Sequence, residues 1–373
     1  MALRLAAFYF AFFAYAGAYV AYFPLYLADR GLGAVEIAAV LALPPLARIF
    51  APAAWGWVAD RTGAHRAIVA FSCAVTAVAF AFLPFTPQIA LLIALMSVLS
   101  AGALPLVEAI TLGSLAGRSG PQLGHYGPIR LWGSIGFIAV VLAGGAWLDR
   151  QPVSTLLAAL VALMLVTLGA ALALPAVKPV AISERAIFRV NPEARALLGA
   201  GFCNALAHGA LYAFLSLHLE REGYSGTMIG ALWTVGVLAE ILVFLWLPQL
   251  FRRFALSAIL IFSLASGVVR FLAIGWGAGE LWIVLLAQLL HAATFGAFHA
   301  AAVAAVHRVF PASAQARGQT LFSGVAYGAG AAAGMVIAGW AWDGGGAGLA
   351  FSVSALAALA GVFFARQLKR ADL

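Results

Sequence analysis

Residues 104–137 read LPLVEAITLGSLAGRSGPQLGHYGPIRLWGSIGF, two apolar segments joined by the polar turn GRSGPQLGHYGP. Glu108 lies inside the first segment, and Arg130 lies near the start of the second. A charge in the hydrocarbon core of a bilayer costs about 2.5 to 3.5 kcal/mol on insertion scales, so it usually faces the interior of a helix bundle. The stretch therefore predicts a membrane hairpin in which two ionisable side chains face each other.

The composition extends this interpretation to the whole chain. Of its 373 residues, 65% are hydrophobic and only 9% are charged, and the mean hydropathy is +1.03. Soluble domains are far less apolar, so we expect a polytopic protein in the lipid bilayer. The net charge of +8 comes from basic residues spread between apolar spans, which argues against nucleic-acid binding. Cys73 and Cys203 lie within apolar segments and are interpreted as buried hydrophobes.

Runs of about 20 apolar residues divide the chain into twelve predicted spans. In the first half they cover residues 5–27, 35–58, 67–83, 89–115, 128–147 and 153–174. In the second half they cover residues 196–219, 228–250, 256–276, 281–306, 320–342 and 349–365. We therefore expect an all-α fold of two six-helix bundles, residues 1–175 and 196–373, joined by a polar cytoplasmic linker at 176–195.

The loops predict the orientation of the chain. Fifteen of the 21 Lys and Arg residues fall in loops on the side of the N-terminus, three fall on the other side and three fall within spans. Because cytoplasmic loops are enriched in Lys and Arg, both termini are expected in the cytoplasm. The first span lacks a signal-peptide cleavage site, so we interpret it as a retained helix. The expected location is a bacterial-type inner membrane.

The loop after the second predicted span contains a motif. Residues 56–66, GWVADRTGAHR, resemble the G-x-x-x-D-R-x-G-R-R signature of the major facilitator superfamily, with Ala64 and His65 in place of the usual basic pair. A basic loop that only fixes orientation would explain the arginines but not the spacing of glycine and aspartate. A second short basic loop, FRRF, follows the eighth span at the matching place, as expected of an internal repeat. The resemblance implies a gate formed by Gly56, Asp60, Arg61 and Gly63.

Five further motifs resemble one group within that superfamily. They are YGPIRLWGSIGF (126–137), HGALYAFLSLHLEREGYS (208–225), GVLAEILVF (236–244), SGVVRF (266–271) and QLLHAATFGAFHAA (288–301). In this order they resemble the 3-phenylpropionic acid transporter group, which is related to lactose permease and to nucleoside proton symporters. The resemblance covers nearly the whole chain and implies solute transport by alternating access.

The resemblance also implies roles for single residues. Glu108 and Arg130 match a substrate-binding Glu and Arg on spans 4 and 5 of lactose permease-like symporters. Arg270 matches an Arg on span 9, and His291 matches a His on span 10. Those symporters carry a proton-bearing Glu one turn after that His, whereas this chain has Thr294 there.

Glu240 on span 8 lies about one helical turn from another acidic position of that site. Together with Glu108 and His291 it is a candidate for proton coupling, with the proton as the coupling ion and no other cofactor. Neutralisation of Arg270 is the alternative role for Glu240.

The charges predicted inside the membrane favour an anionic solute. The cations Arg48, Arg130 and Arg270 outnumber the two glutamates by one. A guanidinium can bind a carboxylate through two parallel hydrogen bonds. Each cation has a structural alternative. In these alternatives, Arg130 and Glu108 form a purely structural ion pair, Arg48 belongs to the cytoplasmic gate, and Arg270 extends its side chain to the membrane surface.

Aromatic side chains, including Tyr19, recur along the first span at three- and four-residue intervals. Such a stripe suits an aromatic solute, although helix packing is its commoner cause. His208 and His299 are interpreted as core histidines bonded to backbone carbonyls. The spacing of the histidines does not suit a metal site.

The sequence thus predicts a transporter, not an enzyme, that moves a small organic anion such as an aromatic monocarboxylate inward with a proton. The predicted substrate-binding residues are Glu108, Arg130, Arg270, Tyr19 and Arg48. The alternative is a sugar or nucleoside symporter, in which Glu108 and Arg130 bond hydroxyl groups. More distant alternatives are a membrane-embedded enzyme or lipid-handling protein, for which no nucleophile with a base appears at usable spacing, and a membrane-embedded sensor, for which no soluble signalling domain appears. We expect a monomer.

Overall fold

The computed structural model describes residues 1–115, 122–176, 190–311 and 314–368. These parts of the chain form helices and loops, without β-strands. The first group of helices comprises α1 (Ala2–Asp29), α2 (Ala34–Arg48), α3 (Ala51–Thr62), α4 (His65–Phe82), α5 (Ile89–Ser100), α6 (Ala103–Leu115), α7 (Gln122–Leu148) and α8 (Leu156–Leu172). The second group comprises α9 (Pro192–Ala207), α10 (Gly209–Arg221), α11 (Gly226–Arg253), α12 (Leu256–Gly277), α13 (Leu281–Leu289), α14 (Phe298–Val309), α15 (Gln315–Ser323) and α16 (Ala331–Ala365).

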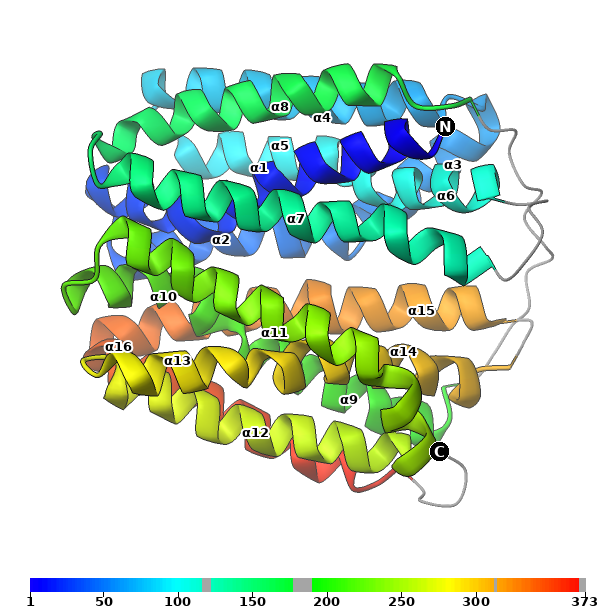
Figure 1. Cartoon of the computed structure of the whole chain (residues 1–373), viewed down its shortest axis with the longest axis vertical. Helices are drawn as coiled ribbons and strands as arrows, with labels where there is room; N and C mark the ends of the chain where they lie inside the picture. Colours follow the sequence, from blue (N-terminus) through cyan, green and yellow to red (C-terminus); the bar gives the residue numbers. More distant parts are fainter. Residues whose placement is uncertain (116–121, 177–189, 312–313, 369–373) are drawn as a thin grey trace.

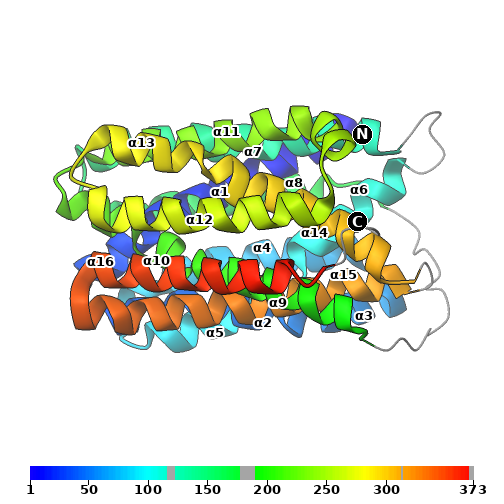
Figure 2. The ribbon, with the colours of Figure 1, turned by 90° about the horizontal axis from the view of Figure 1, so that it is seen from below.

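The described helices account for twelve membrane crossings. Ten stretches are long and apolar enough to cross a membrane, and the bent pair of α2 and α3 makes an eleventh. The last stretch, Gln315–Ala365, has 51 residues, about 75 Å of helix, whereas a bilayer core is about 30 Å thick. It turns back at Gly345 and Gly346, whose backbones leave the helical region, and therefore crosses twice (Figure 2).

Several predicted spans are broken or extended. Pro44 and Pro45 lie in α2, and Pro52 follows the break before α3; proline has no N–H to donate and disrupts helical hydrogen bonding. The fifth span is predicted from residue 128, but α7 already begins at Gln122. The backbone hydrogen bonds of a helix form within the helix, in water as in lipid. A helix can therefore continue beyond the apolar residues that mark the membrane span. The remainder of the predicted polar turn includes residues 116–121, which lie outside the described residues.

Figure 1 shows the two groups side by side, with α1–α8 in the upper part and α9–α16 in the lower part. Met1 and the end of the described chain lie at the same end of the molecule (Figures 1 and 2). We call this the terminal end and the other the opposite end. Most of the predicted linker, residues 177–189, lies outside the described residues, so the domain boundaries stay a prediction.

Toward the opposite end the two groups approach backbone to backbone. The first group contacts the second through α7 against α11 and through α2 against α16. A Cβ atom added at Gly145 would collide with the carbonyl oxygen of Gly226, and one added at Gly230 would collide with that of Val141. Neither space admits a side chain, so this contact requires glycine at both positions.

Asp149, just beyond α7, adds a charged interaction to this contact. Its carboxylate accepts hydrogen bonds from the backbone N–H groups of Gly226 at 2.6 Å and Thr227 at 3.0 Å, and from the Thr227 hydroxyl. Unpaired N–H groups and the helix dipole favour an anion at the start of α11. These hydrogen bonds, that of the Thr227 hydroxyl first, hold the pKa of Asp149 below its usual value. A side chain of the first group thus caps a helix of the second.

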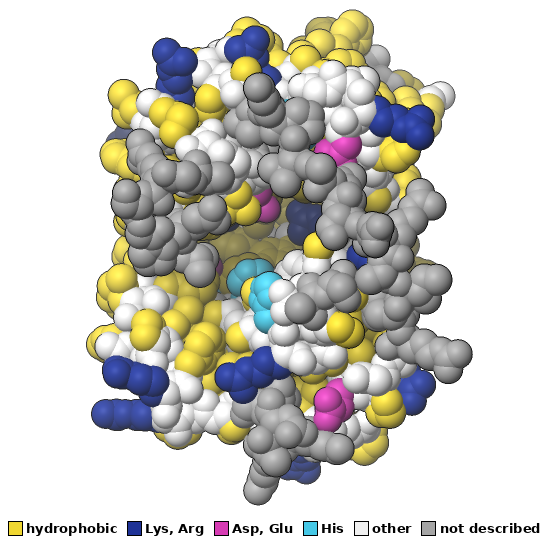
Figure 3. All heavy atoms as spheres, turned by 90° about the vertical axis from the view of Figure 1, so that its right-hand side faces the viewer, with side chains coloured by type: hydrophobic (Ala, Val, Ile, Leu, Met, Phe, Trp, Pro, Cys, Tyr) yellow, Lys and Arg dark blue, Asp and Glu magenta, His cyan; other side chains and the backbone are white. Residues whose placement is uncertain are grey.

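At the terminal end the two groups separate. The main contacts of α3 and α6 are with helices of the first group, and those of α14 and α15 are with the second. Figure 3 views this end and shows a hollow in the middle of the molecule, with histidine, acidic and basic side chains around an apolar floor. The structure is therefore closed at the opposite end and open at the terminal end.

Replacement of Asp149 by alanine is expected to weaken closure of the opposite end. Loss of a helix cap typically changes an equilibrium about fivefold, so the open population should rise by roughly that factor. Spin labels at Gln151 and Glu280, in loops of different groups, should then report longer distances. Because the pKa of Asp149 is lowered, the contact should persist above the ordinary aspartate pKa and weaken only as the pH falls through the lowered value.

Asp343→Ala is the matched control, because it removes an exposed carboxylate near the α16 turn. Equal distance distributions for wild type and the Asp149 variant would contradict a role of Asp149 in closure.

Candidate substrate-binding site

Arg48, the last residue of α2, lies deep in the molecule and yet is exposed. Its electrostatic neighbours come from both groups of helices, Tyr327 and Tyr212 from the second and Glu108 from the first. A side chain that is surrounded by protein and also reached by solvent must face a water-filled space. Arg48 therefore faces a solvent-filled space between the two groups of helices.

Arg130 on α7 is held against aromatic rings of α1. Its guanidinium carbon lies 3.9 Å from the ring centroid of Phe13 and 5.5 Å from that of Tyr9. Such contacts stabilise a cation by about 0.5 to 2 kcal/mol. Gly133 makes room for it, because a Cβ atom there would lie 2.8 Å from Nη1 of Arg130. Tyr126 also hydrogen-bonds to Arg130.

Glu108 on α6 is half-buried, with Arg130 and Arg48 as its electrostatic neighbours. In the described part of the chain, however, neither arginine comes within 4.0 Å of a carboxylate. The predicted facing of Glu108 and Arg130 is thus present without a close ion pair. Both guanidinium groups retain donors for a ligand.

Glu240 and His291 lie together in the second group. Oε2 of Glu240 is 3.7 Å from Nε2 of His291, and Nδ1 of His291 is buried without a hydrogen-bond partner. The charged neighbour of Glu240 is Arg130 of the first group, not Arg270. Glu240 therefore faces the first group across the hollow.

A π-helical segment, η3 (Ala292–Ala297), directly follows His291, and a second one, η5 (Gly324–Gly330), lies farther along the chain. Such segments are frequent at functional sites because they rotate side chains out of the α-helical register. Nδ1 of His299, just after η3, lies 2.7 Å from the hydroxyl of Tyr327 in η5. The prediction that His299 bonds a backbone carbonyl is therefore wrong. The same prediction is confirmed for His208, whose Nδ1 lies 2.8 Å from the carbonyl oxygen of Asn204.

Arg270 has a different environment from the other two cations, with only 1% of its side chain exposed. It donates hydrogen bonds to the carbonyl oxygen of Ala287 at 2.9 Å, to the hydroxyl of Thr294 at 2.9 Å and to Oε1 of Gln288 at 3.0 Å. Thr294, which departs from the family pattern, is thus a partner of this arginine. Arg270 must leave these neutral acceptors before it can bind a substrate.

The aromatic stripe of α1 divides between two environments. Tyr9 and Phe13 face Arg130, whereas Tyr19 stacks on Phe23 at 4.8 Å and contacts Phe80 of α4 at 6.0 Å. The hydroxyl of Tyr19 is buried without a hydrogen-bond partner. In this conformation Tyr19 packs within the first group.

The predicted gate lies around the end of α3. Gly63 ends the helix with a left-handed backbone, φ +67°, and Asp60 lies 3.7 Å from Nε2 of His65. The guanidinium of Arg61 stacks over the ring of Trp57 at 4.1 Å. A Cβ atom at Gly56 would meet nothing within 4 Å, so no close helix approach requires this glycine in the present conformation. Gating by these residues stays a prediction.

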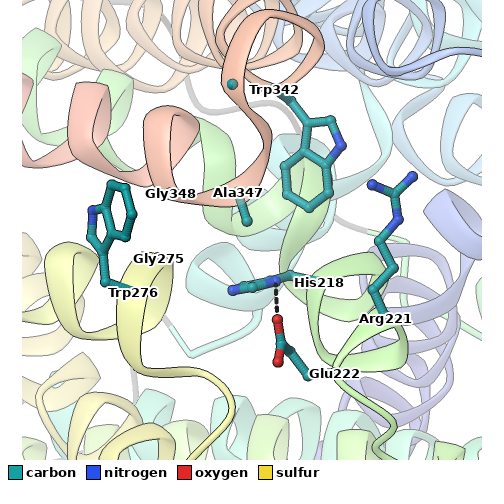
Figure 4. A pocket seen from close by; sticks show the side chains of 9 residues that line it. His218, Arg221, Glu222, Gly275, Trp276, Trp342, Ala347 and Gly348 are labelled. Atoms are coloured by element: carbon teal, nitrogen blue, oxygen red, sulfur yellow. Dashed lines mark ion pairs between the residues drawn. The ribbon is translucent and has the colours of Figure 1, made fainter.

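A second hollow, of about 290 Å³, lies near the α16 turn. Figure 4 shows His218, Arg221, Glu222 and Trp342 around it. His218 bonds the carbonyl oxygen of Ile274 at 3.0 Å and lies 3.8 Å from Glu222, and Arg221 stacks over Trp342. These side chains already have partners, so the central hollow is the stronger candidate site.

Sequence reasoning did not single out Tyr212, Tyr126 or Tyr327 at the central hollow. Tyr327 had a visible signal, since it is the one large polar side chain in the small-residue stretch GVAYGAGAAAG. The contact of Tyr327 with His299, 28 residues away, depends on helix packing and has no local pattern.

Comparison with known proteins supports the same fold. The protein-family model described as "MFS_1 like family" matches residues 2–353. A crystal structure of a mutant of the nucleoside transporter NupG superposes with a TM-score of 0.86 at 18% identity, covering 99% of this chain and 100% of that one. This similarity shows a shared fold.

Curated relatives are transporters rather than enzymes. The "Probable 3-phenylpropionic acid transporter" of Escherichia coli (strain K12) is 33% identical over 257 residues. The match spans 64% of this chain and 64% of that protein, just under two thirds of its length. The "Maltose permease" of Geobacillus stearothermophilus is 27% identical over 339 residues, 87% of this chain and 83% of that protein. The chain therefore belongs to the MFS_1-like family and is an integral membrane protein with the major facilitator fold.

Proposed function

We propose that the protein moves a small organic anion, an aromatic monocarboxylate such as 3-phenylpropionate, together with a proton by alternating access across a bacterial-type inner membrane. In this proposal the terminal end faces the cytoplasm, as the distribution of Lys and Arg favours. The conformation described above is then inward-facing, and the protein acts as a monomer. The name of the relative that is 33% identical supports the substrate class.

One observation carries the proposal. Arg48 and Arg130 each have electrostatic neighbours in both groups of helices, and neither lies within 4.0 Å of a carboxylate in the described chain. A guanidinium with free donors in a site of limited water access binds a carboxylate strongly, because two parallel charge-assisted hydrogen bonds form. Glu108 is an electrostatic neighbour of both arginines but forms no ion pair shorter than 4.0 Å with either.

The rings around Arg130 suit an aromatic acid. Phe13 and Tyr9 flank the guanidinium, and Tyr126 bonds to it. A substrate whose carboxylate meets Arg130 would bring its own ring against these edges and faces. The buried position of Arg270 leads us to assign it a supporting role, in which it holds Thr294 and Gln288.

Glu240 and His291 are the proposed proton site. The two side chains lie 3.7 Å apart, so a proton on either one changes the charge beside the other, and Arg130 is the arginine nearest to Glu240 in its electrostatics. Protonation of Glu240 removes a negative charge near Arg130. An anionic substrate therefore binds better when Glu240 is protonated, and this dependence couples substrate transport to proton transport.

The second candidate function is transport of a sugar or nucleoside. Glu108 favours it, because this carboxylate has no close ion pair and can accept hydrogen bonds from hydroxyl groups. The similarity to a maltose permease and to a nucleoside transporter is consistent with this alternative. Uptake of labelled 3-phenylpropionate, maltose and uridine by liposomes containing the purified protein distinguishes the two.

Arg130→Lys is expected to lower the uptake of labelled 3-phenylpropionate into such liposomes at least tenfold. Lysine keeps the charge but loses the planar fork that binds a carboxylate and stacks on Phe13. Arg150→Lys, in an exposed loop at the opposite end, is the matched control and should transport normally. Uptake by the Arg130→Lys variant at the wild-type level would show that Arg130 is not part of the binding site.

Glu240→Gln is expected to abolish the external alkalinisation that accompanies uptake in lightly buffered liposomes. The amide cannot carry a proton, whereas binding through Arg48 and Arg130 is retained. Exchange of labelled for unlabelled substrate, which needs no net proton movement, should therefore survive. Glu222→Gln, remote from the central hollow, is the control. If the Glu240→Gln variant still alkalinises the external medium as wild type does, a residue other than Glu240 carries the coupled proton.

A further inference from the structure

Three arginines meet at a pocket on the terminal end, away from the central hollow. Arg252 and Arg253 lie in the last turn of α11, and Arg308 lies in the last turn of α14. Together with Phe254 and the start of α12 they line a cavity of about 300 Å³. All three arginines are exposed, and in the described part of the chain none has a carboxylate within 4.0 Å.

Helix dipoles do not account for this concentration of charge. The carboxyl end of a helix carries about half a negative charge. The ends of α11 and α14 thus offset about one of the three positive charges. The amino end of α12 adds positive potential, and Ala255 at its N-cap supplies no side-chain acceptor. The pocket therefore has a positive surplus of about two charges and unpaired N–H donors, the combination that binds phosphate groups.

Apolar surface adjoins the pocket. Phe251 and Phe254 line it, and Phe254 is 54% exposed. Farther along the same helices, Trp246 on α11 and Phe262 on α12 are 68% and 64% exposed. Exposed aromatic and aliphatic side chains on membrane helices face lipid chains. A ligand that meets arginines on one side and apolar surface on the other is amphiphilic.

We propose that this pocket binds the phosphate headgroup of an anionic phospholipid in the leaflet at the terminal end. Basic pockets between membrane helices on the cytoplasmic side recognise such headgroups. The occupant is a lipid rather than free phosphate, because the apolar side chains beside the arginines would contact its glycerol and acyl chains. The site is separate from the proposed transport site and does not depend on its substrate.

Native mass spectrometry of the purified full chain tests this site. Titration with phosphatidylglycerol, phosphatidylcholine and inorganic phosphate compares an anionic lipid, a lipid without net charge and the free anion. Each arginine near a membrane surface contributes roughly a fivefold factor to anionic-lipid binding. The variant Arg252→Gln/Arg253→Gln/Arg308→Gln should therefore bind phosphatidylglycerol at least about tenfold more weakly than wild type.

The matched control is Arg4→Gln/Arg195→Gln/Arg366→Gln, which removes three exposed arginines elsewhere along the chain. It should retain phosphatidylglycerol binding within about threefold, and thermal melting should show both variants folded. An equal loss in both variants would mean general electrostatic attraction and overturn the site. Wild-type protein that binds phosphatidylcholine or inorganic phosphate as tightly as phosphatidylglycerol would overturn the choice of ligand.

Discussion

The cost of placing charge in hydrocarbon determines where the functional residues of this protein can lie. Arg270 meets this constraint through neutral acceptors, Ala287, Gln288 and Thr294, inside the second group of helices. Arg48 and Arg130 meet it in another way, through water and aromatic rings at a hollow between the groups. A cation in contact with water can exchange that water for a ligand. Arg48 and Arg130, both in the first group of helices, are therefore the proposed binding residues.

In the proposed transport cycle the same two groups of helices also separate and close. At the opposite end, glycines at positions 145 and 230 allow backbones to touch, and Asp149 caps α11. Hydrogen bonds to a carboxylate at a helix end are directional and exposed to water, so they can break without the burial of an unpaired charge. A contact of this kind suits an end of the molecule that opens during a transport cycle.

The apolar spans, including the two on either side of residues 116–121, could be predicted because they follow local composition. The break between α2 and α3, which is flanked by prolines, and the turn at Gly346 also had local signals. The partners of charged side chains could not be predicted. Asp149 and Thr227 are 78 residues apart, and their contact depends on the relative placement of two helix groups. Tyr212, Tyr126 and Tyr327 joined the site for the same reason.

The central claim is that the hollow recognises a carboxylate through Arg48 and Arg130. Its most direct test is the binding of 3-phenylpropionate and of its neutral amide, 3-phenylpropionamide, to the purified protein by isothermal titration calorimetry. The two compounds have nearly the same shape and differ in charge. The account predicts that the acid binds at least tenfold more tightly than the amide. Equal affinities, or tighter binding of a neutral nucleoside than of the acid, would contradict it.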